Sequence, residues 1–330
     1  MKIPYLSFSS LIPIVLVNLI FWVIIYPSEF KGDISEEKDN VNQGEPAVIR
    51  FAFVGDICPA KLGEPDENLA EKYLEVASII RSADVSVGNL ECAITGEDFE
   101  AVNKGEYGGG LYYRCSPEYS ILIRDYGFDV MSLANNHTMD FGWEGLIETK
   151  ESLNSLGIKY VGAGDNLYVA LEPLILNVKG IRIAFIAIDD VEPSSFYTKE
   201  KRPGVAHFDY EVLGQIIENT RKGVDILICT VHWGIEDVAK PLTRQRYIVS
   251  KLSEWKVDVI IGSHPHILGP VEMKGDCLIA YSMGNFLFDS QYDYRNRSAI
   301  LIMDWSKSKG ILNYELVPVI VEEGFPIFIK

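Results

Sequence analysis

Basic residues are scarce in this sequence. Its 330 residues include 30 Lys and Arg against 47 Asp and Glu, so the formal net charge is −17 at pH 7. Nucleic-acid binders hold the phosphate backbone with clustered Lys and Arg, and the sequence contains no such stripe. We therefore expect no nucleic-acid partner, and the diffuse acidity favours solubility.

Cysteine is scarce as well. The sequence has five cysteines, an odd number, and none lies in a C-x-x-C pair. Disulfide frameworks and zinc knuckles depend on even numbers or on such paired spacings. Neither kind of site is therefore indicated by Cys58, Cys92, Cys115, Cys229 and Cys277.

Charged residues are missing between Ile3 and Ser28, and the stretch from Leu11 to Tyr26 is almost wholly aliphatic or aromatic. A helix of about 20 apolar residues crosses a bilayer core of about 30 Å. We therefore predict that residues 1–27 form an uncleaved, single-pass anchor in the cell membrane.

Two alternatives to the anchor are less favoured. A cleaved signal peptide lacks its small-x-small cleavage site, because the run ends Ile25-Tyr26-Pro27-Ser28. A buried core helix fits the extreme N-terminal position and the polar stretch after it even less well. The lysines around the segment decide little about its orientation. We expect an extracytoplasmic domain, since an N-terminal anchor preceded by almost no chain usually exports the domain attached to it.

The rest of the chain divides into a linker and a domain. Residues 28–47 are acidic, contain Gly32 and Gly44, and show no apolar periodicity, which is typical of a flexible tether. The chain is 48% hydrophobic, so the remainder is long enough to bury a full core. We assign residues 48–330 to one domain.

From Val48 onward, short β-type runs alternate with helix-length segments, which predicts βαβ units and a largely parallel sheet. Lys179-Gly180 joins two β-branched runs, 174–178 and 181–188, as a hairpin turn would. Three runs in the tail, 278–283, 299–304 and 313–321, have no helix between them and predict a second, mixed or antiparallel sheet. The helical spacing covers Asp66–Arg81, Pro117–Tyr126, Trp143–Leu156, Tyr210–Lys222 and Pro241–Trp255.

Polar motifs come directly after several of the predicted strands. Side chains at the carboxyl ends of adjacent strands meet at one edge of a sheet, which is where open α/β sheets bind their ligands. Imidazoles, carboxylates and an amide gathered at such an edge indicate a metal site. The motifs are Gly55-Asp56, Gly88-Asn89-Leu90-Glu91, Asn136-His137, His232, and His264 with His266.

Each motif also has a purely structural interpretation. Asp56 could belong to a turn, Glu91 to a helix start, and Asn136 to a helix cap. His232 could be a core histidine packed beside an indole. His264 and His266, on either side of Pro265, are harder to explain in this way, because two imidazoles at i and i+2 of an extended segment can point to the same side. Taken together, the strand-end motifs make coincidence a poor explanation.

These motifs resemble those of the CapA family of poly-γ-glutamate capsule biosynthesis proteins, which is similar in turn to the calcineurin-like metallophosphatases. The resemblance covers the chain from Val48 to about Asp289 and implies a four-layer αββα sandwich with a metal site at the sheet edges. Further motifs that carry it are Asp140 with Gly142, His232-Trp233-Gly234 with Glu236, Gly262-Ser263-His264-Pro265-His266 and Tyr281-Ser282-Met283-Gly284-Asn285-Phe286.

The resemblance also implies roles for individual residues. Asp56 matches the first metal-binding Asp, whereas Cys58 stands where the phosphatases have His. Glu91 or Asn89 takes the place of the bridging Asp, and His137 resembles the proton-donating His. The remaining implied metal ligands are Asn136, His232, His264 and His266.

These residue types define the expected chemistry. Mixed nitrogen and oxygen ligands suit Mn, Fe or Zn, and we expect two divalent ions, a pair that typically activates water and clamps a phosphoryl or carboxyl group. His137 lies beside a ligand and is placed to protonate a leaving oxygen, and Asp140, one helical turn later, to orient its ring.

Two classes of function stay open at this stage. One is a membrane-anchored, metal-dependent hydrolase or transferase that acts on a phosphoester or on an amide-linked polymer such as poly-γ-glutamate. The other is a noncatalytic accessory that binds the carboxylates of this anionic polymer within a complex of capsule synthesis subunits.

Overall fold

The structure is a computed structural model, and it describes residues 47–59, 67–104, 111–191, 193–288 and 292–329. The predicted anchor, residues 1–27, lies outside the described residues, as does the linker up to residue 46. Within the described ranges, no helix combines the length and the apolarity needed to cross a membrane.

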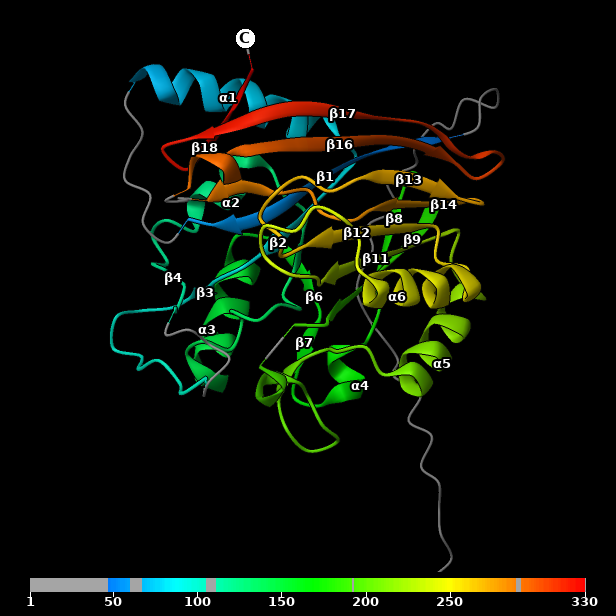
Figure 1. Ribbon diagram of the computed structural model, residues 1–330, viewed down its shortest axis with the longest axis horizontal. Helices are drawn as coiled ribbons and strands as arrows, with labels where there is room; N and C mark the ends of the chain where they lie inside the picture. The colour runs from blue at the N-terminus through cyan, green and yellow to red at the C-terminus, as the bar shows by residue number, and fades with distance from the viewer. Residues whose placement is uncertain (1–46, 60–66, 105–110, 192, 289–291, 330) are drawn as a thin grey trace, which may run out of the picture. The chain divides into compact units, whose positions relative to one another are not determined.

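A mixed eight-stranded sheet forms one half of the described part (Figure 1). Its order is β18-β17-β16-β1-β2-β5-β6, and β15 pairs with β1 off this path. The run from β1 to β6 is parallel, whereas β16, β17 and β18 pair antiparallel. The strands are β1 (Val48–Cys58), β2 (Val85–Leu90), β5 (Val130–Ser132), β6 (Lys159–Val161), β15 (Asn285–Phe288), β16 (Arg297–Ser306), β17 (Gly310–Glu322) and β18 (Phe325–Phe328).

A second, six-stranded sheet has the order β13-β14-β12-β11-β9-β8. Its inner strands are parallel, and antiparallel strands border both sides. The predicted hairpin forms β8 and β9, and Lys179 and Gly180 take φ values of 51° and 76° in its turn. The strands are β8 (Leu174–Val178), β9 (Ile181–Asp189), β11 (Ile226–His232), β12 (Val259–Ser263), β13 (Val271–Lys274) and β14 (Cys277–Ala280).

The predicted helices form close to their expected bounds. The largest difference is α2, which begins four residues after the predicted Pro117 start. Two short pairs, β3 (Ala93–Ile94) with β4 (Arg114–Cys115) and β7 (Ala163–Gly164) with β10 (Gly204–Val205), lie outside the main sheets. The α-helices are α1 (Glu67–Ser82), α2 (Ile121–Tyr126), α3 (Gly142–Ser155), α4 (Leu167–Ala170), α5 (Tyr210–Arg221) and α6 (Thr243–Glu254).

Three apolar cores hold these elements in layers. Strand β1 shows how, because its side chains alternate: Phe51 and Phe53 enter the core between the two sheets, while Ala52 and Val54 enter the core that also contains residues of α1, α2 and α3. The outer face of the second sheet packs in the same way against α5 and α6. The resulting order is helices, sheet, sheet, helices, as the family resemblance implied.

A second, mixed sheet is present, as predicted, but the three runs of the tail do not form it together. Strands β16 and β17 extend the first sheet beside β1, and β14 joins the second sheet beside β12. Spacing along the chain could not reveal this, because β1 has its antiparallel partner far away in sequence: Val48 pairs with Ser306.

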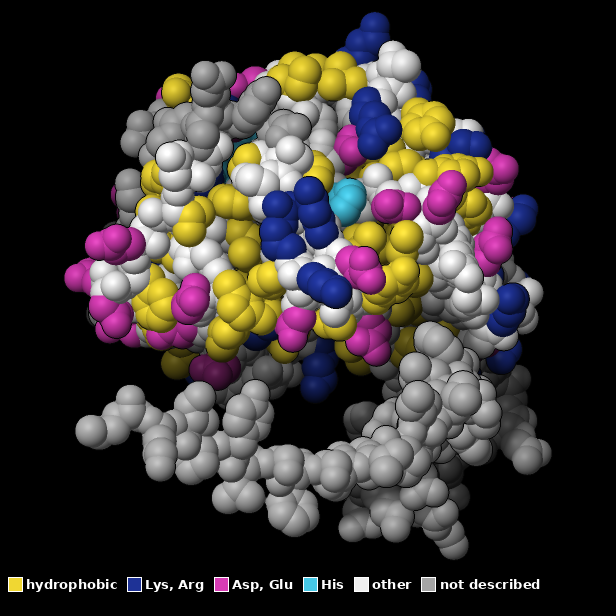
Figure 2. Space-filling view, turned by 90° about the horizontal axis from the view of Figure 1, so that it is seen from below, with side chains coloured by type: hydrophobic (Ala, Val, Ile, Leu, Met, Phe, Trp, Pro, Cys, Tyr) yellow, Lys and Arg dark blue, Asp and Glu magenta, His cyan; other side chains and the backbone are white. Residues whose placement is uncertain are grey.

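Charged side chains are mixed on the face of the molecule seen in Figure 2. Lys and Arg lie among Asp, Glu and hydrophobic side chains there. The net charge of −17 is therefore not concentrated into one acidic field on this face.

Gly55 allows β1 to approach the chain before β15. A Cβ atom at residue 55 would lie 1.8 Å from the carbonyl oxygen of Gly284, far inside contact distance. The same carbonyl accepts a hydrogen bond of 3.0 Å from the N–H of Asp56. The glycine therefore sets the position of Asp56 by letting two backbones touch.

Gly55→Ala is expected to lower the free energy of unfolding by about 1–3 kcal/mol or more, since neither backbone can yield without moving a sheet. Gly223→Ala is the matched control: its Cβ would meet only Arg182, at an ordinary 3.8 Å, and the carbonyl of Thr220, at 3.9 Å. Denaturant unfolding of both variants is the measurement. Equal stability of the two variants would contradict this account of Gly55.

Candidate metal centre

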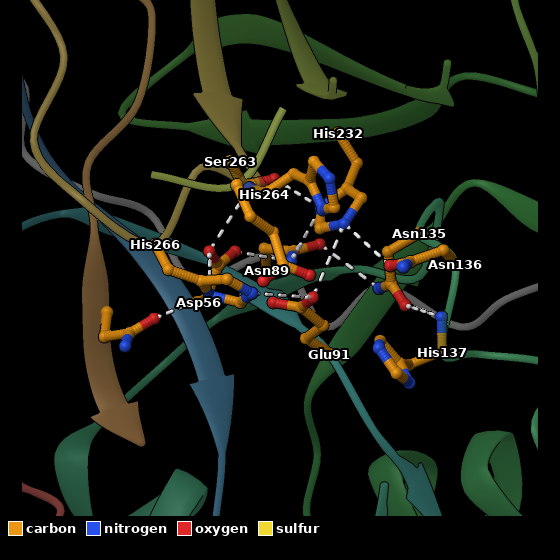
Figure 3. Close-up of polar contacts among 12 residues, drawn as sticks. Asp56, Asn89, Glu91, Asn135, Asn136, His137, His232, Ser263, His264 and His266 are labelled. Atoms are coloured by element: carbon orange, nitrogen blue, oxygen red, sulfur yellow. Dashed lines mark hydrogen bonds and ion pairs between the residues drawn. The ribbon is translucent and has the colours of Figure 1, made fainter. Parts of the chain in front are cut away.

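The structure brings all the predicted metal ligands together where strands of both sheets end (Figure 3). Asp56 lies near the end of β1, and Asn89 lies near the end of β2 with Glu91 just beyond it. The site is thus built by parallel strands from each of the two sheets. The remaining ligands are Asn136 beyond β5, His232 at the end of β11, and His264 and His266 beyond β12.

Asp56 connects the two sheets. The β1 ladder shifts register on either side of it, and such bulges turn a side chain toward a site. Its Oδ1 accepts from Asn89 Nδ2 at 2.8 Å, and its Oδ2 accepts from the backbone N–H of His264 at 3.2 Å. His266 Nδ1 lies 3.4 Å from the same Oδ2.

Glu91 occupies the middle of the site and is fully buried. Neither of its carboxylate oxygens has a hydrogen-bond partner among the described residues. His232 Nε2 and His266 Nε2 lie 3.5 and 3.8 Å from Oε1. Burial, and then the nearby charge of Asp56, raise the pKa of this carboxyl well above its usual range.

Burial lowers the pKa of two of the histidines, of His264 to about 3 and of His232 well below its usual value. They are therefore neutral at pH 7, which is the form that binds metals. Asn136 Oδ1 lies 2.9 Å from His232 Nε2, and Ser263 Oγ lies 2.9 Å from Nδ1.

The pKa of His266 is shifted in the opposite direction to those of His232 and His264. Burial lowers its pKa, but hydrogen bonds to Asp56 and Asn285 and the charge of Asp56 outweigh burial and raise it. Its Nδ1 lies 2.8 Å from Asn285 Oδ1, which fixes the orientation of the ring.

The prediction that His264, Pro265 and His266 form an extended segment was wrong. His264 has a φ of 94° and His266 a φ of 58°, both in the left-handed region that side chains rarely adopt. Such backbone strain persists only where the surroundings enforce it, and it concentrates at functional sites. The two rings nevertheless enter one site, with their centroids 6.0 Å apart.

The donor atoms fit a divalent cation. Glu91, His264 and His266 offer ligand atoms within 4.8 Å of one another, and so do Asp56, Glu91 and His232. Glu91 belongs to both groups, and a cation would satisfy the carboxylate oxygens that lack partners. Cys58 belongs to neither group and lies instead in the core beneath the helices of the first sheet.

His137 and Asp140 form a buried polar group next to the ligands. His137 Nδ1 lies 2.8 Å from Asp140 Oδ2, and Asp140 also accepts from the backbone N–H of Tyr113 at 2.7 Å. Burial lowers the pKa of His137, and the contact with Asp140 partly offsets this effect. The ring of Tyr113 packs against His137 with 4.1 Å between the ring centroids and an angle of 32° between the ring planes.

Sequence patterns assigned no role to Lys104, which completes this group. Its ammonium makes an ion pair with Asp140 Oδ1, lies 3.1 Å from His137 Nδ1, and donates to the carbonyl oxygen of Leu111 at 2.9 Å. A single lysine in a loop has no spacing to mark it. Ser263 and Asn285, by contrast, stand inside recognised motifs and orient His232 and His266.

Lys104→Met should lower the free energy of unfolding by about 3–5 kcal/mol, because it leaves Asp140 as a buried, uncompensated carboxylate. Arg50→Met is the control, since its ion pair with Asp304 is exposed and worth about 0–1 kcal/mol. Urea unfolding of both variants is the measurement. A loss from Lys104→Met no larger than that of the control would refute the assigned ion pair.

Comparison with solved structures supports the fold. The NAD nucleotidase NadN of Haemophilus influenzae superposes with a TM-score of 0.51 at 14% identity, over 87% of this chain and 60% of that one. At this identity the likeness shows a shared fold and does not extend to activity.

Sequence comparisons identify closer relatives. The PGA biosynthesis protein CapA of Bacillus subtilis is 30% identical over 316 residues, which cover 94% of this chain and 81% of that protein. A Mycobacterium tuberculosis protein named "Probable polyglutamine synthesis accessory protein" is 29% identical over 220 residues, 63% of this chain and 56% of its own length. The model of the bacterial capsule synthesis protein family PGA_cap matches residues 50–290. With these relatives and this site, the chain belongs to the PGA_cap family of bacterial capsule synthesis proteins.

Proposed function

We propose that this protein is a metal-dependent hydrolase or transferase of poly-γ-glutamate biosynthesis, with two divalent ions bound at the strand ends. We further propose that residues 1–27 anchor it in the cell membrane and that its domain is extracytoplasmic. The other capsule synthesis subunits would then be its partners at the membrane.

The state of Glu91 carries the proposal of a two-ion site. A buried carboxylate must be protonated, paired or bound to a cation, because an isolated charge in a dry interior is very costly. Glu91 has both oxygens unpaired among the described residues, and it is shared by two groups of possible ligands. A carboxylate placed in this way suits a bridge between two ions.

The residues of the site would have three different roles. Asp56, Asn89, Glu91, Asn136 and the three histidines would hold the ions, whose chemistry is to polarise a substrate oxygen and lower the pKa of a bound water. His137 is placed to give a proton to a leaving group through Nε2, since Nδ1 faces Asp140. Lys104 makes an ion pair with Asp140 and holds its carboxylate in place.

The family and the donor set both bear on the substrate class. The name of the B. subtilis relative favours a γ-linked glutamate polymer, whose amide carbonyl and side-chain carboxylate both offer oxygens to a divalent ion. The fold and the mixed ligands also suit a phosphoester. Assays on both substrates are therefore needed.

A noncatalytic role is the second candidate. The name of the M. tuberculosis relative describes an accessory of polyglutamine synthesis. In that role the same ions would bind carboxylates of the growing polymer, and His137 would serve only the packing of the site.

The first test is metal stoichiometry. Glu91→Gln should abolish binding of both ions because it removes the shared ligand, whereas His264→Ala should chiefly weaken one of them. His207→Ala, a histidine outside both ligand groups, is the control and should retain full occupancy. Plasma mass spectrometry of protein reconstituted with Mn, Fe or Zn gives the ratios. Full metal content in Glu91→Gln would exclude the assigned site.

The second test separates catalysis from binding. His137→Asn should keep its metal and lose about a hundred-fold to ten-thousand-fold in turnover, the usual contribution of a positioned acid. The loss should be smaller on phosphodiesters with good leaving groups, which need no proton. If the metal-loaded wild type binds poly-γ-glutamate but turns over neither polymer nor phosphodiester, the accessory role is favoured instead.

A further inference from the structure

Arg295 is tied to the loop that carries two of the metal ligands. It ends the short 3-10 helix η3 (Asp293–Arg295), and its Nε and Nη2 donate to the two carboxylate oxygens of Asp237 at 2.7 Å each. Nη2 also donates to Glu236 at 2.8 Å. The backbone N–H of Asp237 donates in turn, at 3.0 Å, to the carbonyl oxygen of Pro265, which lies between the two ligands of that loop.

The guanidinium of Arg295 keeps one nitrogen free. Asp237 and Glu236 occupy three of its five N–H donors, and Nη1 carries the other two. Among the described residues Nη1 has no hydrogen-bond partner, and it is not one of the fully buried polar atoms, so a molecule in the site can reach it. The charge of Arg295 lowers the pKa of His264, so the guanidinium lies within electrostatic reach of a metal ligand.

Tyr113 has a second free donor near the ligands. Its backbone N–H is bound by Asp140, and its ring lies against those of His137 and Phe288, with 4.1 and 5.6 Å between centroids. The ring of Phe288 lies in turn 5.2 Å from that of His266. Within the described part of the chain, the Tyr113 hydroxyl has no hydrogen-bond partner, and it too is not fully buried.

The charges that act on Tyr113 place its hydroxyl near both Glu91 and Arg295. Burial raises its pKa most, the charge of Glu91 raises it further, and the charge of Arg295 lowers it. A tyrosine with a raised pKa keeps its proton at neutral pH and therefore serves as a donor. The hydroxyl and Nη1 are thus two free donors beside the same ligands.

The alternative for Arg295 is a purely structural ion pair. Arg50 shows such a pair in this protein: its Nε and Nη2 make the same fork on Asp304, and 49% of its side chain is exposed, so water hydrates its remaining donors. Only 12% of the Arg295 side chain is exposed, so the two N–H groups of Nη1 depend on what occupies the site. This difference favours binding of an anion, whose oxygens make short, charge-assisted bonds to guanidinium donors.

We propose that Arg295 Nη1 and the Tyr113 hydroxyl bind a carboxylate of the substrate that is not a metal ligand. In a γ-linked glutamate polymer this group is the free carboxylate beside the amide that reacts. The proposal rests on the function proposed above and names the group that the same site recognises. Two donors suit the two oxygens of one carboxylate. The bonds to Asp237 and Glu236 hold the guanidinium in place before the substrate binds, which lowers the cost of binding.

Binding of a defined ligand by the full chain, loaded with Mn in mild detergent, tests the proposal. The ligands are a γ-linked glutamate trimer and the same trimer with its free carboxylates converted to carboxamides. Tyr113→Phe keeps the ring and loses the hydroxyl, and Arg295→Lys keeps a cation for Asp237 and loses Nη1. Each variant should bind the acid about ten-fold to a hundred-fold more weakly than wild type, the usual contribution of a hydrogen bond to a charged group. Binding of the amide, measured by calorimetry, should not change.

Tyr294→Phe and Arg50→Lys are the matched controls. The hydroxyl of Tyr294 already donates to Asp237, and Arg50 makes its fork near the opposite end of β1 from Asp56. Both controls should bind the acid as wild type does.

Metal content should be equal to that of wild type in all four variants, which separates this test from that of the ions, and binding requires no turnover. The carboxylate site would be excluded by a wild type that binds acid and amide equally, or by unchanged acid binding in Tyr113→Phe and Arg295→Lys. Equal weakening of both ligands, or loss of metal from either variant, would also exclude it.

Discussion

The site depends on two carboxylates, Asp56 and Glu91, held next to each other without solvent. Both side chains are fully buried, which makes a charge on either one costly, and the charge of Asp56 raises the pKa of Glu91. Asp56 offsets this cost through hydrogen bonds from Asn89 and from the backbone of His264. Glu91 accepts no hydrogen bond among the described residues, and the nearest imidazole nitrogens lie 3.5 and 3.8 Å from its Oε1, so two carboxylate charges are stable here only with a cation.

The fold meets this requirement by accepting strain in the backbone near the carboxylates. Gly55 lets β1 touch the chain at Gly284, and the register of β1 shifts at Asp56. His264 and His266 take left-handed conformations that cost about 1–3 kcal/mol each. Two packed sheets can enforce such conformations because the strands on either side of each loop are buried and fixed.

Sequence reasoning identified the strands that build the site, because runs such as 224–231 are apolar and end in a polar motif. The convergence of Asp56 and Glu91 was predictable from the rule that adjacent parallel strands share one ligand-binding edge. That His232 joins them depends on the packing of the second sheet against the first, which only the family resemblance implied. Lys104 was not predictable, since a buried cation in a loop has no periodicity. Nor was the antiparallel pairing of β1 with β16, which joins segments about 250 residues apart and depends on tertiary packing alone.

Asp140 is a second buried carboxylate in this protein with which Glu91 can be compared. Asp140 is also fully buried, and the chain supplies Lys104 as a built-in cation for it. Among the described residues, no Lys or Arg makes an ion pair with Glu91, and its neighbours are histidines, two of which burial keeps neutral. A fold that compensates one buried carboxylate with a lysine could have done so for the other. A site for an external divalent cation requires that no such basic residue pairs with Glu91, since an ammonium beside Glu91 would compete with the ion.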